Sequence, residues 1–146
     1  MFIQRSSTSR VRVPLTIKIL VVDTHGVVQE MIKEMLTPLE CQVITASSTA
    51  LAIFLARKNF PSLIVLNTAG PQDDMDLPRE ISHDSDLCQI PVLVFVPPEH
   101  PEMLHSVETS EMTRVLRRPQ TAHTLRDILI PYLRETADER EAETTE

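Results

Sequence analysis

Continuous apolar runs constrain this chain most strongly. Residues 16–22, 63–66 and 91–96 consist mainly of Val, Ile and Leu, without the polar alternation of a strand that has one wet face. Such runs are typical of strands that are buried on both faces of a parallel sheet. Apolar segments at 41–46 and 112–116 predict two further strands, so we expect a sheet of five strands.

Helix-like segments separate these strands. The second of them can be capped by Ser47 or Ser48 and carries Leu51, Phe54 and Leu55. Strands that alternate with helices favour an α/β fold with right-handed crossovers and helices on both faces of the sheet. We expect the helices over 27–36, from Ser48 to before Pro61, from the cap residue Asp76 to Ile81, weakly over 101–107, and from Thr121 through Leu133.

The charge distribution divides the chain. The first residues carry Arg and Lys and no acid, whereas the last are mostly Glu and Asp. We predict a disordered basic arm over 1–15, one domain over 16–134 and a disordered acidic tail over 135–146. The Arg- and Ser-rich start also has the composition of an organelle transit peptide, an alternative that composition does not decide.

Composition excludes several classes of function. The net charge of −7 argues against nucleic acid as a partner, and no apolar run is long enough for a membrane span. Cys41 and Cys88 lack metal or redox spacing, so we predict reduced core thiols in a cytoplasmic protein. The chain has two glycines, Gly26 and Gly70, which leaves no Gly-rich cradle for a nucleotide cofactor.

In open parallel sheets, function collects where the carboxyl ends of the strands meet the loops. Here those ends are Asp23-Thr24, Asn67, Val96 and Arg118. Around them the chain resembles the receiver domains of bacterial response regulators, of the minimal chemotaxis type, over about residues 17–134. The resemblance rests on the order and spacing of Lys-Ile-Leu-Val-Val-Asp (18–23), Pro-Ser-Leu-Ile-Val-Leu-Asn (61–67) with Pro71, Ile-Pro-Val-Leu-Val (90–94), Arg-Pro (118–119) and Thr-Ala-His-Thr-Leu (121–125).

The resemblance implies a flavodoxin-like fold with strand order 2-1-3-4-5. It also implies a phosphoryl transfer to an aspartate, with acids that hold Mg²⁺, a lysine and a hydroxyl. Matched to that set, the acceptor position holds Asn67, and an amide cannot form an acyl phosphate. The other matched positions are Asp23, Thr24 in place of the second acid, Val96 in place of the hydroxyl, Arg118 in place of the lysine and Val115 in place of the aromatic switch.

These replacements predict a rearranged pocket. One carboxylate beside one guanidinium is about neutral, which favours an Asp23–Arg118 ion pair, with Asn67 hydrogen-bonded to it, over a bound Mg²⁺. The three prolines of 97–101 predict a rigid loop. By resemblance, the Arg118–Pro119 peptide bond is expected to be cis.

We therefore expect a non-enzymatic, stand-alone pseudo-receiver of bacterial two-component signalling, without metal or cofactor. Its expected partner is another signalling protein, a sensor kinase or effector, and its last helix, which Pro131 should kink or end, is expected to contribute to a homodimer or partner contact. The candidates for that partner face are Arg114, Arg117, Arg126, Tyr132 and Leu133.

Two alternatives stay open. The first is a phosphorylatable regulator with a displaced acceptor such as Asp74 or Asp23, although 73–76 also suits a solvated loop with a helix cap. The second is a flavodoxin-like enzyme that binds a cofactor. The spacing of His100 and His105 favours surface side chains over metal ligands.

Overall fold

A parallel sheet of five strands forms the centre of the molecule, in the order β2-β1-β3-β4-β5. The computed structural model describes residues 17–23, 26–36, 41–71, 75–105 and 110–144, with side chains up to Leu133 except that of Val27. This topology confirms the flavodoxin-like fold expected from the sequence, and each strand lies within one residue of its predicted bounds. The strands are β1 (Ile17–Asp23), β2 (Cys41–Ala46), β3 (Leu63–Asn67), β4 (Val92–Val96) and β5 (Thr113–Arg117).

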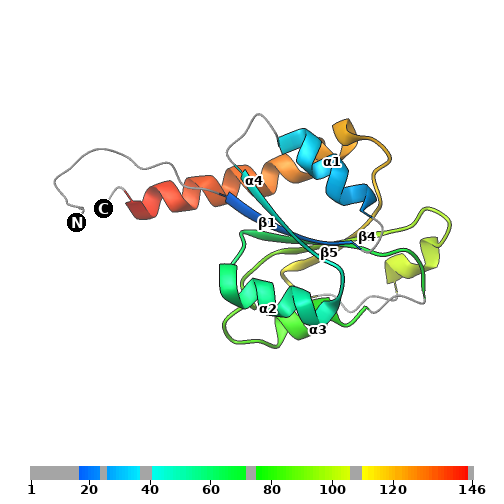
Figure 1. The fold of residues 1–146 in the computed structure, drawn as a ribbon, viewed down its shortest axis with the longest axis horizontal. Helices are drawn as coiled ribbons and strands as arrows, with labels where there is room; N and C mark the ends of the chain where they lie inside the picture. Colours follow the sequence, from blue (N-terminus) through cyan, green and yellow to red (C-terminus); the bar gives the residue numbers. More distant parts are fainter. Residues whose placement is uncertain (1–16, 24–25, 37–40, 72–74, 106–109, 145–146) are drawn as a thin grey trace.

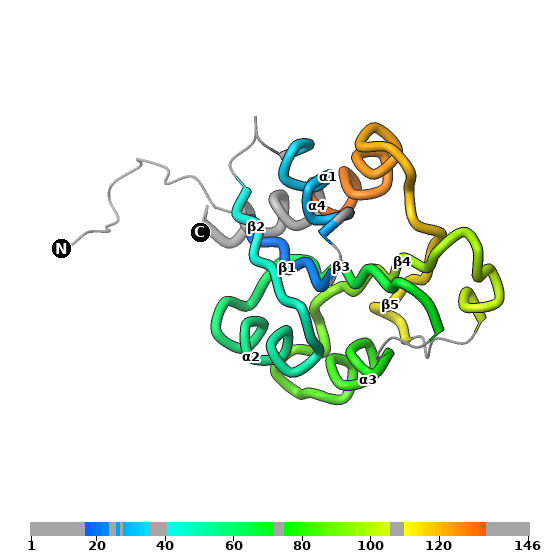
Figure 2. The backbone as a smooth tube through the Cα atoms, turned by 45° about the vertical axis from the view of Figure 1, so that its right-hand side comes forward, coloured from blue at the N-terminus to red at the C-terminus, as the bar shows by residue number. Residues whose placement is uncertain are grey.

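Helices cover both faces of the sheet, as Figures 1 and 2 show. Helices α1 (Val27–Leu36) and α4 (Ala122–Thr144) lie on one face, and α2 (Thr49–Asn59), α3 (Leu77–Ser82) and the 3₁₀-helix η1 (Pro101–His105) lie on the other. Neighbouring residues of β1 point to opposite layers: Leu20 packs with the α2 side and Val21 with the α1 side. The sheet is therefore buried on both faces, which explains its continuous apolar strands.

Helix α2 buries a different face from the one its large apolar residues suggest. Ser48 caps the helix as predicted, because its hydroxyl accepts a hydrogen bond from Leu51 N at 3.2 Å. The fully buried residues are Ala52 and Ala56, whereas Leu51 is 41% and Phe54 60% exposed. The small alanine side chains let the helix lie close to the sheet, and this packing turns Leu51 and Phe54 to the solvent.

Helix α4 runs further than the sequence predicts. Pro131 neither ends the helix nor marks its boundary, because α4 continues to Thr144. That continuation passes through most of the segment for which the sequence predicts a disordered acidic tail, so the expectation is wrong for the helical part. The helix continues past Pro131 because proline removes one backbone donor but does not prevent the next turns from forming. The predicted basic arm, residues 1–15, lies outside the described residues.

Several smaller predictions are also decided. The weak helix after β4 is the short 3₁₀-helix η1, and Asp76 precedes α3 but makes no side-chain cap bond to it. Asp76 instead pairs with Arg79 at 3.3 Å. Both cysteines are free thiols and half-buried, and burial raises the pKa of the Cys41 thiol. Over the described part of the chain, no helix combines the length and hydrophobicity that a bilayer crossing requires.

Candidate functional site at the carboxyl edge of the sheet

Asp23 and Asn67 meet at the carboxyl edge of the two central strands. They are the last residues of β1 and β3 and stand opposite each other in the strand register. Both side chains are buried, Asp23 to 7% and Asn67 to 5% exposure, at the end of strands that are otherwise apolar. Their burial means that each polar atom needs a hydrogen-bond partner inside the protein.

The Asp23 carboxylate is held by helix α1 and by Asn67. Its Oδ2 accepts hydrogen bonds from the backbone of Val28 at 2.9 Å and of Gln29 at 3.3 Å. Its Oδ1 accepts one from Asn67 Nδ2 at 3.2 Å, which confirms the predicted contact between these two residues. The carboxylate thus neutralises the positive end of the α1 dipole and satisfies two of its unpaired amides.

Asn67 is only half satisfied. Its amide nitrogen donates to Asp23, but its buried Oδ1 has no hydrogen-bond donor among the described residues. A carboxylate in the same position would place a second negative charge against Asp23. The amide avoids that repulsion because its nitrogen turns the contact into a hydrogen bond.

Arg118 does not pair with Asp23, and this prediction is wrong. Its Nη1 donates to the backbone oxygen of Thr68 at 3.4 Å, and its Nη2 lies 4.0 Å from Glu99 Oε1. The backbone N–H of Arg118 donates to Val96 O at 2.8 Å. This hydrogen bond places the backbone of Arg118 beside the end of β4. The guanidinium therefore joins β3 to the loop after β4, while Asp23 already has donors from its own end of the sheet.

Val96, Pro119 and Thr24 are the remaining predicted pocket residues. Val96 is fully buried in the core, and Pro119 is also buried. All peptide bonds of the described residues are trans, so the predicted cis bond between Arg118 and Pro119 is wrong. The trans form is the intrinsically favoured isomer even before proline. Thr24 lies outside the described residues.

Thr68 is a pocket residue that the sequence analysis missed. It is 1% exposed, and both its N–H and its hydroxyl donate to Phe95 O, at 3.0 and 3.1 Å. The carbonyl oxygen of Thr68 accepts a hydrogen bond from Arg118 Nη1. A signal was present in the sequence, because a hydroxyl residue directly follows the position that the resemblance assigns to the acceptor. The hydroxyl is engaged with the backbone of β4 and takes no part in the Asp23–Asn67 contact.

The predicted partner face is mixed. Arg114 on β5 donates to the Tyr132 hydroxyl of α4 at 3.4 Å, so these two candidates touch, and Arg117 and Arg126 are exposed. Leu133 is 5% exposed and packs in the core with Leu125 and Leu129. Leu125, Leu129 and Leu133 follow one another at four-residue intervals along the same buried face of α4, so Leu133 supports the partner face from beneath, while its part in a contact stays a prediction.

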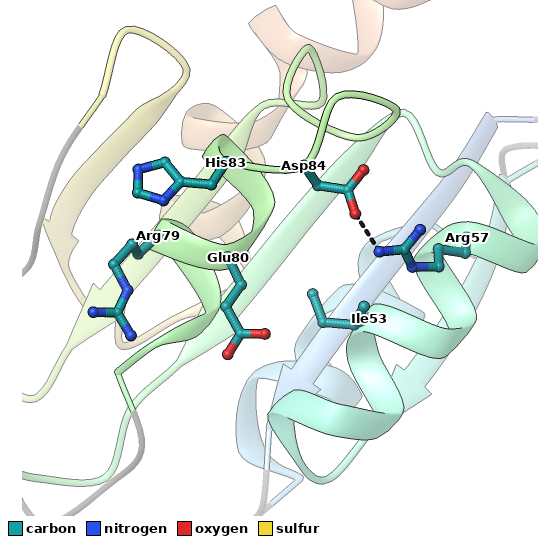
Figure 3. A pocket seen from close by; sticks show the side chains of 6 residues that line it. All are labelled: Ile53, Arg57, Arg79, Glu80, His83 and Asp84. Atoms are coloured by element: carbon teal, nitrogen blue, oxygen red, sulfur yellow. Dashed lines mark hydrogen bonds and ion pairs between the residues drawn. The ribbon is translucent and has the colours of Figure 1, made fainter.

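A second polar cluster lies between α2 and α3. The cavity there has a volume of about 250 Å³. Figure 3 shows side chains that line it: Arg57 of α2 pairs with Asp84, which follows α3, and Ile53 and Glu80 lie between them and Arg79. His83 and Arg79 line its other side. The Arg57–Asp84 ion pair fixes the end of α2 against the turn that follows α3.

The described residues bring together no group of three His, Cys, Asp or Glu side chains that could hold a metal ion. His100 pairs with Glu102 at 3.0 Å, and that contact lies at the surface of η1. The hydrogen bonds of Glu102, first from its own backbone and then from His100, lower the pKa of its carboxyl group. Asp73 and Asp74 are outside the described residues.

Comparison with solved structures identifies the fold. A response regulator from Chloroflexus aurantiacus superimposes with a TM-score of 0.69 at 19% identity, covering 82% of this chain and 98% of that one. The chemotaxis response regulator CheY4 of Vibrio cholerae gives 0.63 at 21% identity, covering 81% and 99%. The chain has the receiver fold. A receiver domain of a sensor histidine kinase from Pseudomonas aeruginosa, solved with a magnesium ion coordinated in its active-site cleft, gives 0.64 at 20% identity, covering 81% and 98%.

Two sequence relatives match part of the chain. Two proteins described as probable transcriptional regulator ycf27, from Porphyra purpurea and Pyropia yezoensis, are 37% identical over 71 residues. That match covers 48% of this chain and 29% of each relative, so the chain matches less than a third of the length of these relatives. No protein-family model matches the chain.

Proposed function

We propose that this protein is a pseudo-receiver of bacterial two-component signalling, located in the cytoplasm. It keeps the receiver fold, takes up no phosphoryl group at the usual position, catalyses no reaction of its own and acts by binding another signalling protein. The observation that carries the proposal is the state of Asn67, which occupies the end of β3 and donates its amide to the buried Asp23 carboxylate.

The chemistry of Asn67 supports this proposal directly. Acyl phosphate formation needs a carboxylate oxygen that attacks phosphorus. The amide oxygen of Asn67 carries no formal charge, and the nitrogen lone pair is delocalised into the carbonyl. The buried Oδ1 of Asn67 is also an unsatisfied acceptor, so its environment supplies no donor that would stabilise an added phosphoryl group among the described residues.

The pocket is also a poor fit for the Mg²⁺ that receiver chemistry requires. Mg²⁺ needs oxygen ligands in a near-octahedral arrangement and gives up its water reluctantly. Here Asp23 supplies a carboxylate, but each of its oxygens already accepts a hydrogen bond from an N–H group. Because Asn67 is an amide and the described residues form no group of three His, Cys, Asp or Glu side chains, Asp23 is left without the further acids that receiver chemistry uses to hold the ion, so no step of the proposed function uses a metal.

The elements that would report phosphorylation are replaced as well. Val96 is an apolar core residue and cannot follow a phosphate by hydrogen bonding. The loop after β4 begins with Pro97 and Pro98, and Glu99 of that loop lies 4.0 Å from Arg118. Prolines restrict this loop, and the contact with Arg118 joins it to the end of β5. These features support a module that binds its partner in one conformation.

Phosphorylation can be tested by intact-mass analysis after incubation with acetyl phosphate and Mg²⁺. We expect no stoichiometric, hydroxylamine-labile gain of a phosphoryl group on the wild-type chain. The control is the triple variant Thr24→Asp, Asn67→Asp, Arg118→Lys, which restores the acid pair, the nucleophile and the lysine and should gain mass. Wild-type labelling, with the site mapped to Asp23 or Asp74, would show instead a phosphorylatable regulator with a displaced acceptor.

A further inference from the structure

Helix α2 exposes an apolar surface that the fold does not use. Leu51, Phe54 and Phe60 are the large hydrophobic residues that the described part of the chain leaves exposed, at 41, 60 and 53%. Leu51, Phe54 and Lys58 follow one another at three- and four-residue spacing, so they form a single row on the helix. We call Leu51, Phe54, Lys58 and Phe60 the α2 outer patch.

Phe60 adds an observation of its own. It ends α2 in the left-handed conformation, with φ 46°, a position that favours glycine because a Cβ there is strained. Neither the backbone nor the core accounts for a phenylalanine at this position, since its ring is half exposed. A large aromatic side chain held at the surface is instead typical of protein contacts.

The charge around the patch indicates the chemistry of its partner. The chain carries 21 acidic residues, yet residues 41–72 contain no Asp or Glu, and their only charged residues are Arg57 and Lys58. Arg57 pairs with Asp84 and keeps a side chain that is 56% exposed. Lys58 has no ion pair among the described residues. Glu80 and Asp84 line the same pocket as Arg57, so Lys58 is the cation that the α2 outer patch presents without an ion pair among the described residues, on a chain of net charge −7.

This charge pattern disfavours two other occupants. In a second copy packed through the same patch, Arg57 and Lys58 would face either the same two cations or the positive end of the partner's α2 dipole. An anionic membrane would attract these two cations weakly, at about 1 kcal/mol each, and would repel a chain of net charge −7. Neither surface supplies the acids that the patch lacks.

We propose that the α2 outer patch docks an acidic amphipathic helix of a partner protein. Apolar side chains of that helix cover Leu51, Phe54 and Phe60, while its Glu or Asp side chains pair with Lys58 and Arg57. The patch lies beside the edge strand β2, on the opposite face of the sheet from α1 and α4 (Figure 2). The inference deepens the proposed function by naming a surface and the chemistry of its partner.

The test uses a designed helical peptide of about 18 residues with leucines along one face and glutamates on both flanks. Fluorescence anisotropy measures its affinity for the full chain, and amide NMR shifts locate the contact. We expect shifts confined to α2 and residue 60. Phe54→Ser should weaken binding at least about tenfold. Lys58→Gln should weaken it about threefold, and the matched control Lys33→Gln, an exposed lysine of α1 on the other face of the sheet, should leave it unchanged.

If Phe54→Ser folds poorly, a charge reversal at Lys58 still tests the proposal. Lys58→Glu should lose affinity for the glutamate peptide and gain affinity for the same peptide with lysines in place of glutamates. No saturable binding, or binding that Phe54→Ser and Lys58→Glu both retain, would overturn the proposal.

Two further experiments test the other two occupants of the patch, a membrane surface and a second copy of the chain. Binding to vesicles with about 30% phosphatidylserine that Phe54→Ser abolishes would assign the patch to a membrane surface. A dimer in sedimentation that Phe54→Ser dissolves would assign it to a second copy. The phosphorylation experiment at Asn67 is independent of all these results, so the two proposals fail separately.

Discussion

Asn67 shows how one residue sets the hydrogen bonding at the carboxyl edge of the two central strands. The amide donates to Asp23, whose other oxygen binds the start of α1. An aspartate in the same position would turn a hydrogen bond into a contact between two buried carboxylates. The amide at position 67 therefore avoids this repulsion and stabilises the buried Asp23 carboxylate.

The variant Asn67→Asp should be less stable than the wild type by about 3 kcal/mol near neutral pH, because it buries a second carboxylate without a partner. Two buried carboxylates in contact repel each other less when one of them carries a proton. Part of the lost stability should therefore return when the variant is measured at acid rather than neutral pH.

Urea denaturation at both pH values measures this recovery as a change in the free energy of unfolding. Asn67→Leu is the matched control, since it removes the amide without adding a charge and should recover less at acid pH. If Asn67→Asp is as stable as the wild type near neutral pH, the amide at position 67 is not what holds Asp23 in its place.

At the scale of single elements, α4 is the helix that departs most from expectation. Pro131 lies inside it and cannot donate a hydrogen bond to Asp127 O, yet the helix runs from Ala122 to Thr144. The packing of Leu125, Leu129 and Leu133 against the sheet offsets the loss of that hydrogen bond. Tertiary contacts thus override a local signal that predicts a kink or an end.

Replacing Pro131 by alanine should therefore stabilise the chain, by up to about 3 kcal/mol, because it restores the backbone donor and removes the clash of the ring with the preceding turn. Urea denaturation followed by far-UV circular dichroism measures the gain. The exposed position Gln120→Ala, outside the helix, is the control. A destabilised Pro131→Ala variant would show that the helix depends on the geometry that proline imposes.

The sequence predicts the strands well and the faces of the helices less well. Strands buried on both sides need unbroken apolar runs, so their positions and order can be read with little ambiguity. For α2, the sequence cannot show that Ala52 and Ala56 face the sheet, because close approach of helix and sheet favours small residues over large ones. The exposed Leu51 and Phe54 became visible as a surface only in the structure.

The candidate site divides in the same way. Asp23 and Asn67 could be placed from the ends of their strands, because strand register fixes where adjacent residues stand. The hydrogen-bond partner of Arg118 could not be predicted, because its long side chain can reach several acceptors and loops decide where these acceptors lie. Thr68 O and Glu99 belong to such loops, and their positions follow from the turns after β3 and β4 rather than from any motif.

At the scale of the whole molecule, the sheet separates two surfaces. Helix α2, which carries the α2 outer patch, lies on one face of the sheet, and helix α4, which carries Arg126 and Tyr132 of the predicted homodimer or partner contact, lies on the other (Figure 1). Under the two proposals, one copy of the chain has a separate surface for each of two partners. Variants on one side should leave binding on the other unchanged, because residues far apart without shared partners act additively.

The α4 surface can be tested with two neighbouring residues that differ in burial. Tyr132→Ala should keep the fold and move the sedimentation coefficient toward that of a monomer, since it removes a half-buried ring beside Arg114. Leu133→Glu should lower the free energy of unfolding by about 4 kcal/mol, because it places a charge in the core. A loss of association in Leu133→Glu alone would thus report unfolding, and an unchanged sedimentation profile in Tyr132→Ala would remove this face from the candidate contacts. Urea denaturation of both variants separates the two effects.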